Sequence, residues 1–231
     1  MSEKKRENPL LNIGFNIIIP SIIMSKADDW LHVSPATALI LALIFPIAYG
    51  LYDFFENKKC NMFSIIGFAS ILLTGTIGLM HLPKEYIAIK EALVPLILGV
   101  VVLFSAFTKH PLVEMLLFND SFLKMDVVNK IVDEQNKQHV IANMKKKYTM
   151  YFASSFLLSA ILNFILAKIL IHSETGTVEF NKELGRMTFW SYPVIVLPCT
   201  IVLMLILWRM INDIEKSLKV NFEEIIRIGQ K

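Results

Sequence analysis

Charged residues are scarce in this chain of 231 residues. Asp, Glu, Lys and Arg together make up 19% of it, whereas a soluble domain usually carries about a quarter. The shortage is uneven, because long segments without any charge alternate with short charged segments. Hydrophobic residues reach 55%, and the mean hydropathy is +0.55. This pattern argues against a water-soluble domain and predicts an all-α membrane protein.

Cysteines and recognised catalytic motifs are nearly absent as well. The two cysteines, Cys60 and Cys199, fall at different expected depths in the membrane, so no disulfide is predicted between them. The chain has no glycine-rich phosphate loop, no His-x-x-x-His pair and no Gly-x-Ser-x-Gly elbow. Its net charge of +3 does not point to nucleic acid. We therefore expect no enzyme activity, cofactor, metal site or nucleic-acid partner. An intramembrane enzyme is a disfavoured alternative, because no nucleophile and base pair is recognisable.

Six segments lack Asp, Glu, Lys and Arg, and each is long enough for about one membrane crossing. They cover residues 9–25, 35–52, 60–80, 92–108, 148–167 and 187–208. A helix rises about 1.5 Å per residue and the hydrocarbon core is about 30 Å thick. With flanking turns included, spanning helices are predicted at 9–25, 35–54, 60–80, 87–108, 148–171 and 187–208, in a single membrane domain covering 1–231. No segment alternates polar and apolar residues, so strands are not expected.

The basic residues predict how these helices are oriented. With six spans, successive segments between the helices alternate between the two sides of the membrane. The segments on the side of the N-terminus contain 17 of the 23 Lys and Arg residues, and those on the opposite side contain six. Lys and Arg gather in cytoplasmic loops. Both termini are therefore expected in the cytoplasm, with the protein spanning a bacterial inner membrane several times. An odd number of helices would mix the two groups, which supports the count of six.

Two segments on the predicted cytoplasmic side, 110–147 and 209–231, carry apolar residues at helical spacing. In the first, Val127, Val128, Ile131, Val132, Val140, Ile141 and Met144 precede Lys145, Lys146 and Lys147. This spacing predicts one amphipathic helix on the inner leaflet, with its basic end near anionic headgroups. The second segment carries Ile211, Ile214, Leu218, Phe222, Ile225 and Ile226. A face that binds a partner protein is the alternative for both.

Polar residues within or beside the predicted spans gather in the outer half of the membrane, where they cost free energy. The candidate ligand-binding residues are Lys90, Glu91, Asn163, Lys168, Arg186 and Tyr192. Lys90 is the sharpest case, because Glu91 adjoins it and Pro95 follows about one turn later. Adjacent residues do not face each other on a helix, so Lys90 and Glu91 are each expected to need a partner on another helix.

The functional hypothesis for these residues is a polar cavity, open to the outside, that holds an anionic group near Lys90, Lys168 and Arg186. The alternative is that both lysines extend to the outer interface, as lysines near helix ends do. Asn12 and Asn16 lie one turn apart on the first helix, where they would line a polar path or form hydrogen bonds between helices. His32, His81 and His172 map to the outer ends, where interfacial packing is favoured over a shared metal site.

Several segments resemble one bacterial family. Residues 35–59 (PATALILALIFPIAYGLYDFFENKK), 64–79, 86–107 (YIAIKEALVPLILGVVVLFSAF) and 109–120 are similar to the inner-membrane septation protein A family, also called intracellular septation proteins. Residues 154–171 and 179–188 resemble its fifth helix and outer loop. The longer N-terminal piece at 9–24 and the extended connection depart from the family and point to a sister group of uncharacterised membrane proteins. The resemblance supplies no catalytic residues.

The resemblance implies a role in cell-envelope biogenesis or division, exerted by binding partners or lipid. Membrane lipids, envelope or division proteins and a second copy of the chain are the expected partners. The alternative is a small transporter or channel whose outward-facing cavity takes an anionic solute or a lipid headgroup. A pore would need a homo-oligomer, because six short helices enclose little interior.

Overall fold

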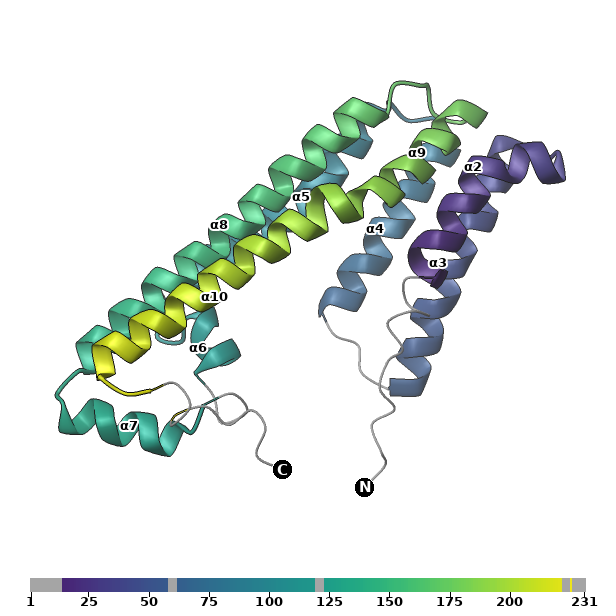
Figure 1. The fold of residues 1–231 in the computed structure, drawn as a ribbon. Helices are drawn as coiled ribbons and strands as arrows, with labels where there is room; N and C mark the ends of the chain where they lie inside the picture. Colours follow the sequence, from purple (N-terminus) through teal and green to yellow (C-terminus); the bar gives the residue numbers. More distant parts are fainter. Residues whose placement is uncertain (1–13, 58–61, 119–122, 222–224, 226–231) are drawn as a thin grey trace. The chain divides into compact units, whose positions relative to one another are not determined.

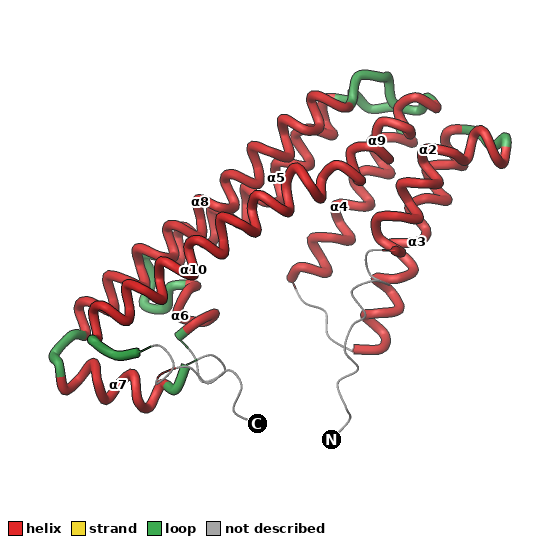
Figure 2. Tube along the Cα trace, in the orientation of Figure 1, coloured by secondary structure: helices red, strands yellow, loops and turns green. Residues whose placement is uncertain are grey.

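The computed structural model describes residues 14–57, 62–118, 123–221 and 225 of the chain. Within these ranges it is helical and contains no strand, as Figures 1 and 2 show. The all-α prediction is confirmed there. The elements are η1 (Gly14–Ile18), α2 (Ile19–Leu31), α3 (Pro35–Asn57), α4 (Met62–Leu79), α5 (Glu85–Ser105), α6 (Leu112–Leu117), α7 (Met125–Glu134), α8 (Gln138–Leu170), α9 (Val178–Ser191), η2 (Tyr192–Val196) and α10 (Leu197–Leu218).

Within the described ranges, four helical stretches are long and apolar enough to cross a membrane. They are Pro35–Tyr52, Glu85–Ser105, Gln138–Leu170 and Val178–Leu218, the last formed by α9, η2 and α10 together. Only 11% of the apolar window in Val178–Leu218 is buried inside the protein. A continuous apolar surface of this length would promote aggregation in water but is stable in hydrocarbon. The chain is therefore best described as a multi-pass membrane protein.

These four stretches correspond to the predicted spans at 35–54, 87–108, 148–171 and 187–208, with shifted ends. The predicted spans at 9–25 and 60–80 extend into residues outside the described ranges. The described part of the latter includes the shorter apolar helix Ala69–Leu79. In the sixth predicted span, Pro193 lies within the π-helical turn η2. Proline has no N–H for the helical ladder, so a local change of hydrogen-bond pattern is expected beside it.

Two compact units make up the chain. Unit 1 comprises Met1–Val94 and Ala160–Val196, and unit 2 comprises Pro95–Ser159 and Leu197–Lys231. The boundaries fall within α5, within α8 and between η2 and α10. Long helices thus contribute residues to both units.

Unit 1 is held by close helix packing around α2, which contacts both α3 and α9. Small residues make this possible, because Ala27, Ala38 and Ala42 are almost fully buried. A Cβ atom added at Gly185 of α9 would lie 2.8 Å from the backbone oxygen of Ser21 on α2. Small residues let helix backbones approach closely in membranes, where dispersion replaces the hydrophobic effect as the packing force.

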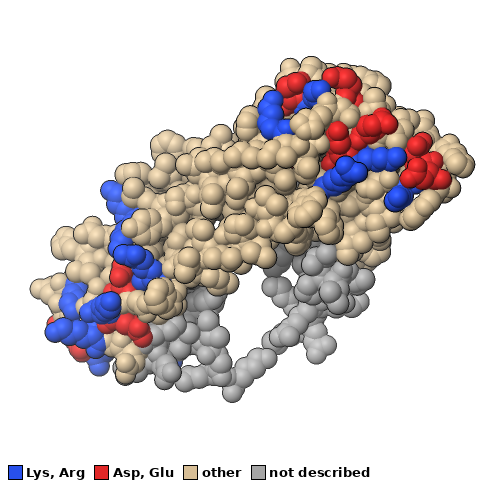
Figure 3. All heavy atoms as spheres, turned by 45° about the horizontal axis from the view of Figure 1, so that its top comes forward, with Lys and Arg blue, Asp and Glu red and all other residues tan. Residues whose placement is uncertain are grey.

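Unit 2 has a core at the end where α8 begins and α10 ends, with α6 and α7 packed beside them (Figure 1). Its fully buried side chains include Val113, Val128, Tyr148, Thr149, Ile214, Leu218 and Ile225. In the face that Figure 3 draws, charged side chains gather at this end of unit 2, and residues without charge cover the adjoining length of the helices. Exposed apolar side chains on these helices include Ile97, Val101, Leu157 and Leu205. The unit therefore combines a buried core at one end with an apolar surface along its helices.

The connection 110–147 differs from the prediction of one amphipathic helix. The apolar series is divided between α7 and the first turns of α8, which runs on without a break into the predicted fifth span. Asn136 separates the two with φ of 56°. The N–H groups of Asn136 and Lys137 donate to the carbonyls of Asp133 and Val132, at 3.1 and 2.9 Å. This is the Schellman arrangement, which ends helices at residues that tolerate the left-handed conformation.

The second amphipathic segment, 209–231, also continues a membrane helix. Residues 209–218 belong to α10, and the helix ends where Lys219 has φ of 56°. The N–H of Val220 donates to the carbonyl of Glu215 at 3.3 Å. Most of the remaining tail lies outside the described ranges.

Candidate functional site

Lys90 is the most deeply buried charged side chain among the predicted site residues, with 7% of its surface exposed. It extends from α5 to α4, where its Nζ lies 2.7 Å from Thr74 Oγ1 and 3.2 Å from Ser70 Oγ. Ser70 and Thr74 are four residues apart, so they share one face of α4. Nζ also lies 2.7 Å from Glu91 Oε1. We call these four residues the Lys90 cluster.

The direct pairing of Lys90 with Glu91 corrects the sequence prediction that each would need a partner on another helix. That prediction is wrong for Glu91 and right for Lys90, whose other partners come from α4. The rule for adjacent residues concerns the directions of their Cβ atoms. The flexible four-carbon stem of lysine can curve around the helix to a neighbouring carboxylate.

The hydrogen bonds of the Lys90 cluster account for the whole ammonium group. A lysine ammonium has three N–H donors, and Thr74, Ser70 and Glu91 each supply a side-chain acceptor. A buried charge is costly unless it is paired in this way. The arrangement leaves no N–H of Lys90 free for an anionic ligand and connects α4 to α5.

The other predicted binding residues have different surroundings. Lys168 is exposed on α8, and its Nζ lies 6.0 Å from the centre of the Phe164 ring. Arg186 is exposed on α9, Tyr192 at the start of η2 is 39% exposed, and Asn163 is half-buried on α8. Among the contacts of the described residues, none joins Lys168, Arg186 or Tyr192 to Lys90. The exposed position of Lys168 agrees with the alternative in which this side chain extends to the interface.

The predicted polar path falls largely outside what the structure describes. Asn12 lies outside the described residues, and only the backbone of Asn16, in η1, is described. The described histidines, acidic residues and cysteines include no group of three or more arranged to hold a metal ion. His81 instead places Nδ1 3.1 Å from the carbonyl oxygen of Thr175.

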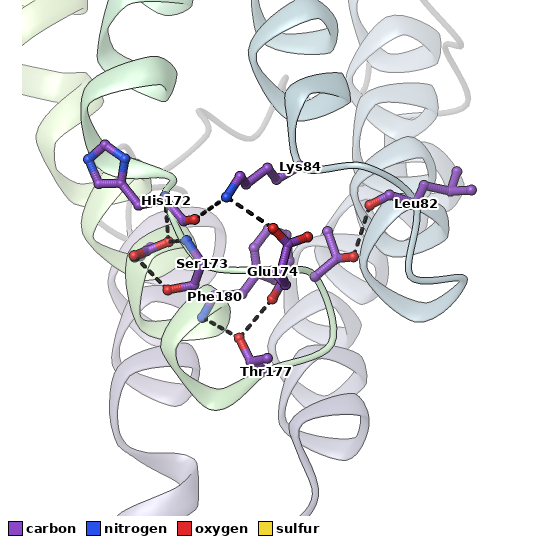
Figure 4. A network of polar contacts seen from close by, with 9 residues as sticks. Leu82, Lys84, His172, Ser173, Glu174, Thr177 and Phe180 are labelled. Atoms are coloured by element: carbon purple, nitrogen blue, oxygen red, sulfur yellow. Dashed lines mark hydrogen bonds and ion pairs between the residues drawn. The ribbon is translucent and has the colours of Figure 1, made fainter.

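Unit 1 contains a second polar network that the sequence did not reveal, between the α4–α5 turn and the loop that follows α8 (Figure 4). Lys84 forms an ion pair with Glu174 at 3.1 Å and donates to the carbonyl of His172. Thr175 Oγ1 donates to the carbonyl of Leu82 at 2.9 Å. We call this network, with Glu183, the loop clasp. It joins residues about ninety positions apart, which no local pattern could predict.

Glu183 of α9 completes the loop clasp. Its carboxylate accepts hydrogen bonds from the N–H groups of His172 and Ser173 and from the Ser173 hydroxyl, all at 2.9 Å. Glu183 comes before the predicted span 187–208 in the sequence, so it lies outside the segment that is expected to cross the membrane. Burial acts to raise the pKa of Glu183, but these hydrogen bonds outweigh it and hold the pKa below its ordinary value.

Unit 2 has a polar contact at Asp213, which the sequence analysis did not single out. Tyr148 donates its hydroxyl proton to Asp213 Oδ2 at 2.6 Å, and Lys147 Nζ lies 3.0 Å from the same oxygen. Asp213 follows the end of the predicted sixth span. The hydrogen bond from Tyr148, together with that from Lys147, lowers the pKa of Asp213 below its ordinary value. The contact fixes the start of α8 against the end of α10.

A pocket of about 580 Å³ lies in unit 2 where α5 ends and α8 begins. Its lining includes Lys109, Lys145 and Lys146, the carboxylates Glu114 and Asp133, and the apolar residues Phe118, Val128, Val132 and Ile141. We call it the lysine pocket. The sequence indicated the basic triad at 145–147, but not that residues of α6 and α7 would line an open pocket beside it.

Comparison with known proteins found no matching family model, curated protein or solved structure. The similarity to the septation protein A family therefore stays a prediction.

Proposed function

We propose that this chain is a bacterial inner-membrane protein of the septation protein A type, with six spans and both termini in the cytoplasm. It acts in envelope biogenesis or division by binding lipid or protein partners, without catalysing a reaction. The proposal combines the sequence resemblance with a fold of apolar, weakly buried helices. Polar contacts that join α4 to α5 around Lys90 are consistent with this binding role.

One observation favours a binding role over a transport role: each N–H donor of Lys90 has a hydrogen-bond acceptor within the Lys90 cluster. A carrier for an anion needs donors that can exchange between ligand and protein. Here the three side-chain acceptors match the three donors of Lys90. The cluster therefore supports a role in holding α4 and α5 together.

Aromatic and basic residues support the proposed orientation. Tyr151, Trp208 and Phe107 are exposed in unit 2, at 39%, 65% and 63%, close in sequence to Lys147, Arg209 and Lys109. Exposed aromatic rings favour the headgroup level, and Lys and Arg favour the cytoplasmic side.

A deletion strain complemented with variants tests the proposal. Loss of the protein is expected to alter cell length or septum placement, and a strain with a normal envelope and normal division would contradict the role. The informative variant is Lys90→Met with Glu91→Met, because removing both members of a buried pair is often close to neutral for stability. We expect this double variant to insert, fold and complement.

A small carrier or channel is the second candidate, favoured by the presence of an ion pair and two hydroxyls near the predicted outer end of a span. Intramembrane ionisable residues often mark transport pathways. A carrier that uses Lys90 predicts that the double variant folds but loses solute flux in proteoliposomes and fails to complement. That result would favour transport over the binding role.

A further inference from the structure

The lysine pocket lies where a membrane helix leaves the predicted bilayer. Its rim begins with Ala106, Thr108 and Lys109, directly after the end of α5 at Ser105. Phe104 and Phe107, on either side of that end, are 69% and 63% exposed. Exposed aromatic residues of this kind suit the level of the lipid headgroups. A ligand in this pocket would therefore be within reach of the bilayer.

The pocket has cations that its own carboxylates do not neutralise. Lys145 is paired with Glu114 at 2.8 Å, and Asp133 accepts a hydrogen bond from Gln138 at 2.9 Å. Lys146 has an aromatic partner instead, with Nζ 4.6 Å from the centre of the Phe107 ring. Lys109 is exposed and has no hydrogen bond or ion pair among the described residues. Lys109 and Lys146 are thus available to an anion.

The remaining lining is suited to a molecule with both polar and apolar parts. Val128, Val132 and Ile141 form a buried wall, and Asn129 and Asn143 add polar groups at the lining. The volume of about 580 Å³ lies within the range of about 300–1,000 Å³ that is usual for small-molecule sites. A phosphate ion alone would leave most of it unfilled.

We propose that the lysine pocket binds the phosphate-bearing headgroup of an anionic phospholipid from the inner leaflet. Lys109 and Lys146 contact the phosphate, and the exposed Phe104 and Phe107 lie beside the upper acyl chains. This inference rests on the proposed function, which assigns this end of unit 2 to the cytoplasmic interface. It specifies the lipid class and the residues that select it.

Native mass spectrometry of the full-length protein in mild detergent tests the inference, with phosphatidylglycerol, phosphatidylcholine and inorganic phosphate as separate probes. We expect one phosphatidylglycerol to bind in preference to phosphatidylcholine. The double variant Lys109→Gln/Lys146→Gln should weaken this binding roughly twenty-five-fold, because each lysine near an anionic surface contributes about fivefold to the affinity. The matched control, Lys26→Gln/Lys130→Gln, removes the same charge from exposed positions outside the pocket and should bind as the native protein does.

A third variant separates the pocket from general surface charge. Ala142 is exposed and lines the pocket, so Ala142→Trp fills the space while keeping every lysine, and it should abolish the preference for phosphatidylglycerol. Unchanged binding in Ala142→Trp, equal losses in the two lysine pairs, or equally strong binding of inorganic phosphate would each overturn the inference. Complementation of the deletion strain is scored separately, so a pocket variant that loses lipid but still complements refutes only a functional need for this site. A deletion without phenotype refutes the proposed function instead.

Discussion

The packing of α2 against α9 makes a sharp prediction for Gly185. In Gly185→Ala the new Cβ would lie 2.7 Å from Ser25 Oγ, 2.8 Å from the backbone oxygen of Ser21 and 3.3 Å from Met24 Cβ. The Ser25 side chain can rotate away, but the Ser21 carbonyl belongs to the backbone of α2. The two helices must therefore separate by several tenths of an ångström, and overpacking of this kind costs about 1–3 kcal/mol.

Gly50 of α3 provides the matched control, because a Cβ added there meets no atom within 4 Å. Both glycines lie within helices, so both substitutions gain about 1 kcal/mol in helix propensity. The propensity term cancels in the comparison, which leaves the packing cost. Gly50→Ala should equal or exceed the native protein in stability, and Gly185→Ala should be about 1–3 kcal/mol less stable than Gly50→Ala.

Reversible unfolding in mixed micelles, followed by circular dichroism, measures this difference. Crosslinking between cysteines placed on α2 and α9 reports whether the loss comes from separation of these helices. Equal stability of the two alanine variants would refute the close approach of α2 and α9, and with it the packing of unit 1.

Three further predictions concern buried and polar groups. Lys90→Met alone should destabilise the protein by about 3 kcal/mol, because it leaves Glu91 partly buried without its partner, whereas the double Met variant should stay near native stability in the same micelle titration. Ser21→Ala should leave the free energy of unfolding unchanged or raise it by about 1 kcal/mol, because the Ser21 hydroxyl is buried without a hydrogen-bond partner among the described residues. A variant that is less stable than the native protein by more than about 1 kcal/mol would show that this hydroxyl has a partner. The pKa of Glu183 is lowered on folding, so its contribution to the loop clasp is complete above its ordinary value of 4.5 and is lost as pH falls through the lowered pKa. The protection of the His172 and Ser173 amides against hydrogen exchange, measured relative to their intrinsic exchange rates, should therefore fall at acid pH in the native protein. Glu183→Gln should remove most of that pH dependence.

Much of the helical architecture could be predicted from the distribution of charge. A charged side chain in hydrocarbon is so costly that long uncharged segments mark helices in lipid. Most of the segments 35–52, 92–108 and 148–167 lies within α3, α5 and α8, whereas 187–208 is divided among α9, η2 and α10. Helix ends were less predictable, because they depend on local backbone bonds. Asn136 was the available signal for the break between α7 and α8, since Asn tolerates the left-handed conformation that ends a helix.

The polar contacts were the least predictable part. Lys90 drew attention because of its expected depth, but its partners Ser70 and Thr74 depend on how α4 packs against α5. The loop clasp and the contact of Tyr148 with Asp213 join residues far apart in sequence. Such pairs arise from tertiary packing, which local periodicity does not encode.

Cysteine accessibility in spheroplasts tests the central claim, that the apolar helices cross a membrane with the lysine-rich connection inside. In a protein with Cys60 and Cys199 replaced by serine, single cysteines are introduced as Glu174→Cys in the loop after α8 and Lys146→Cys at the start of α8. We predict that a membrane-impermeant maleimide labels position 174 in spheroplasts and labels position 146 only after permeabilisation. Labelling of both positions from the same side, or of position 146 alone from outside, would contradict the account.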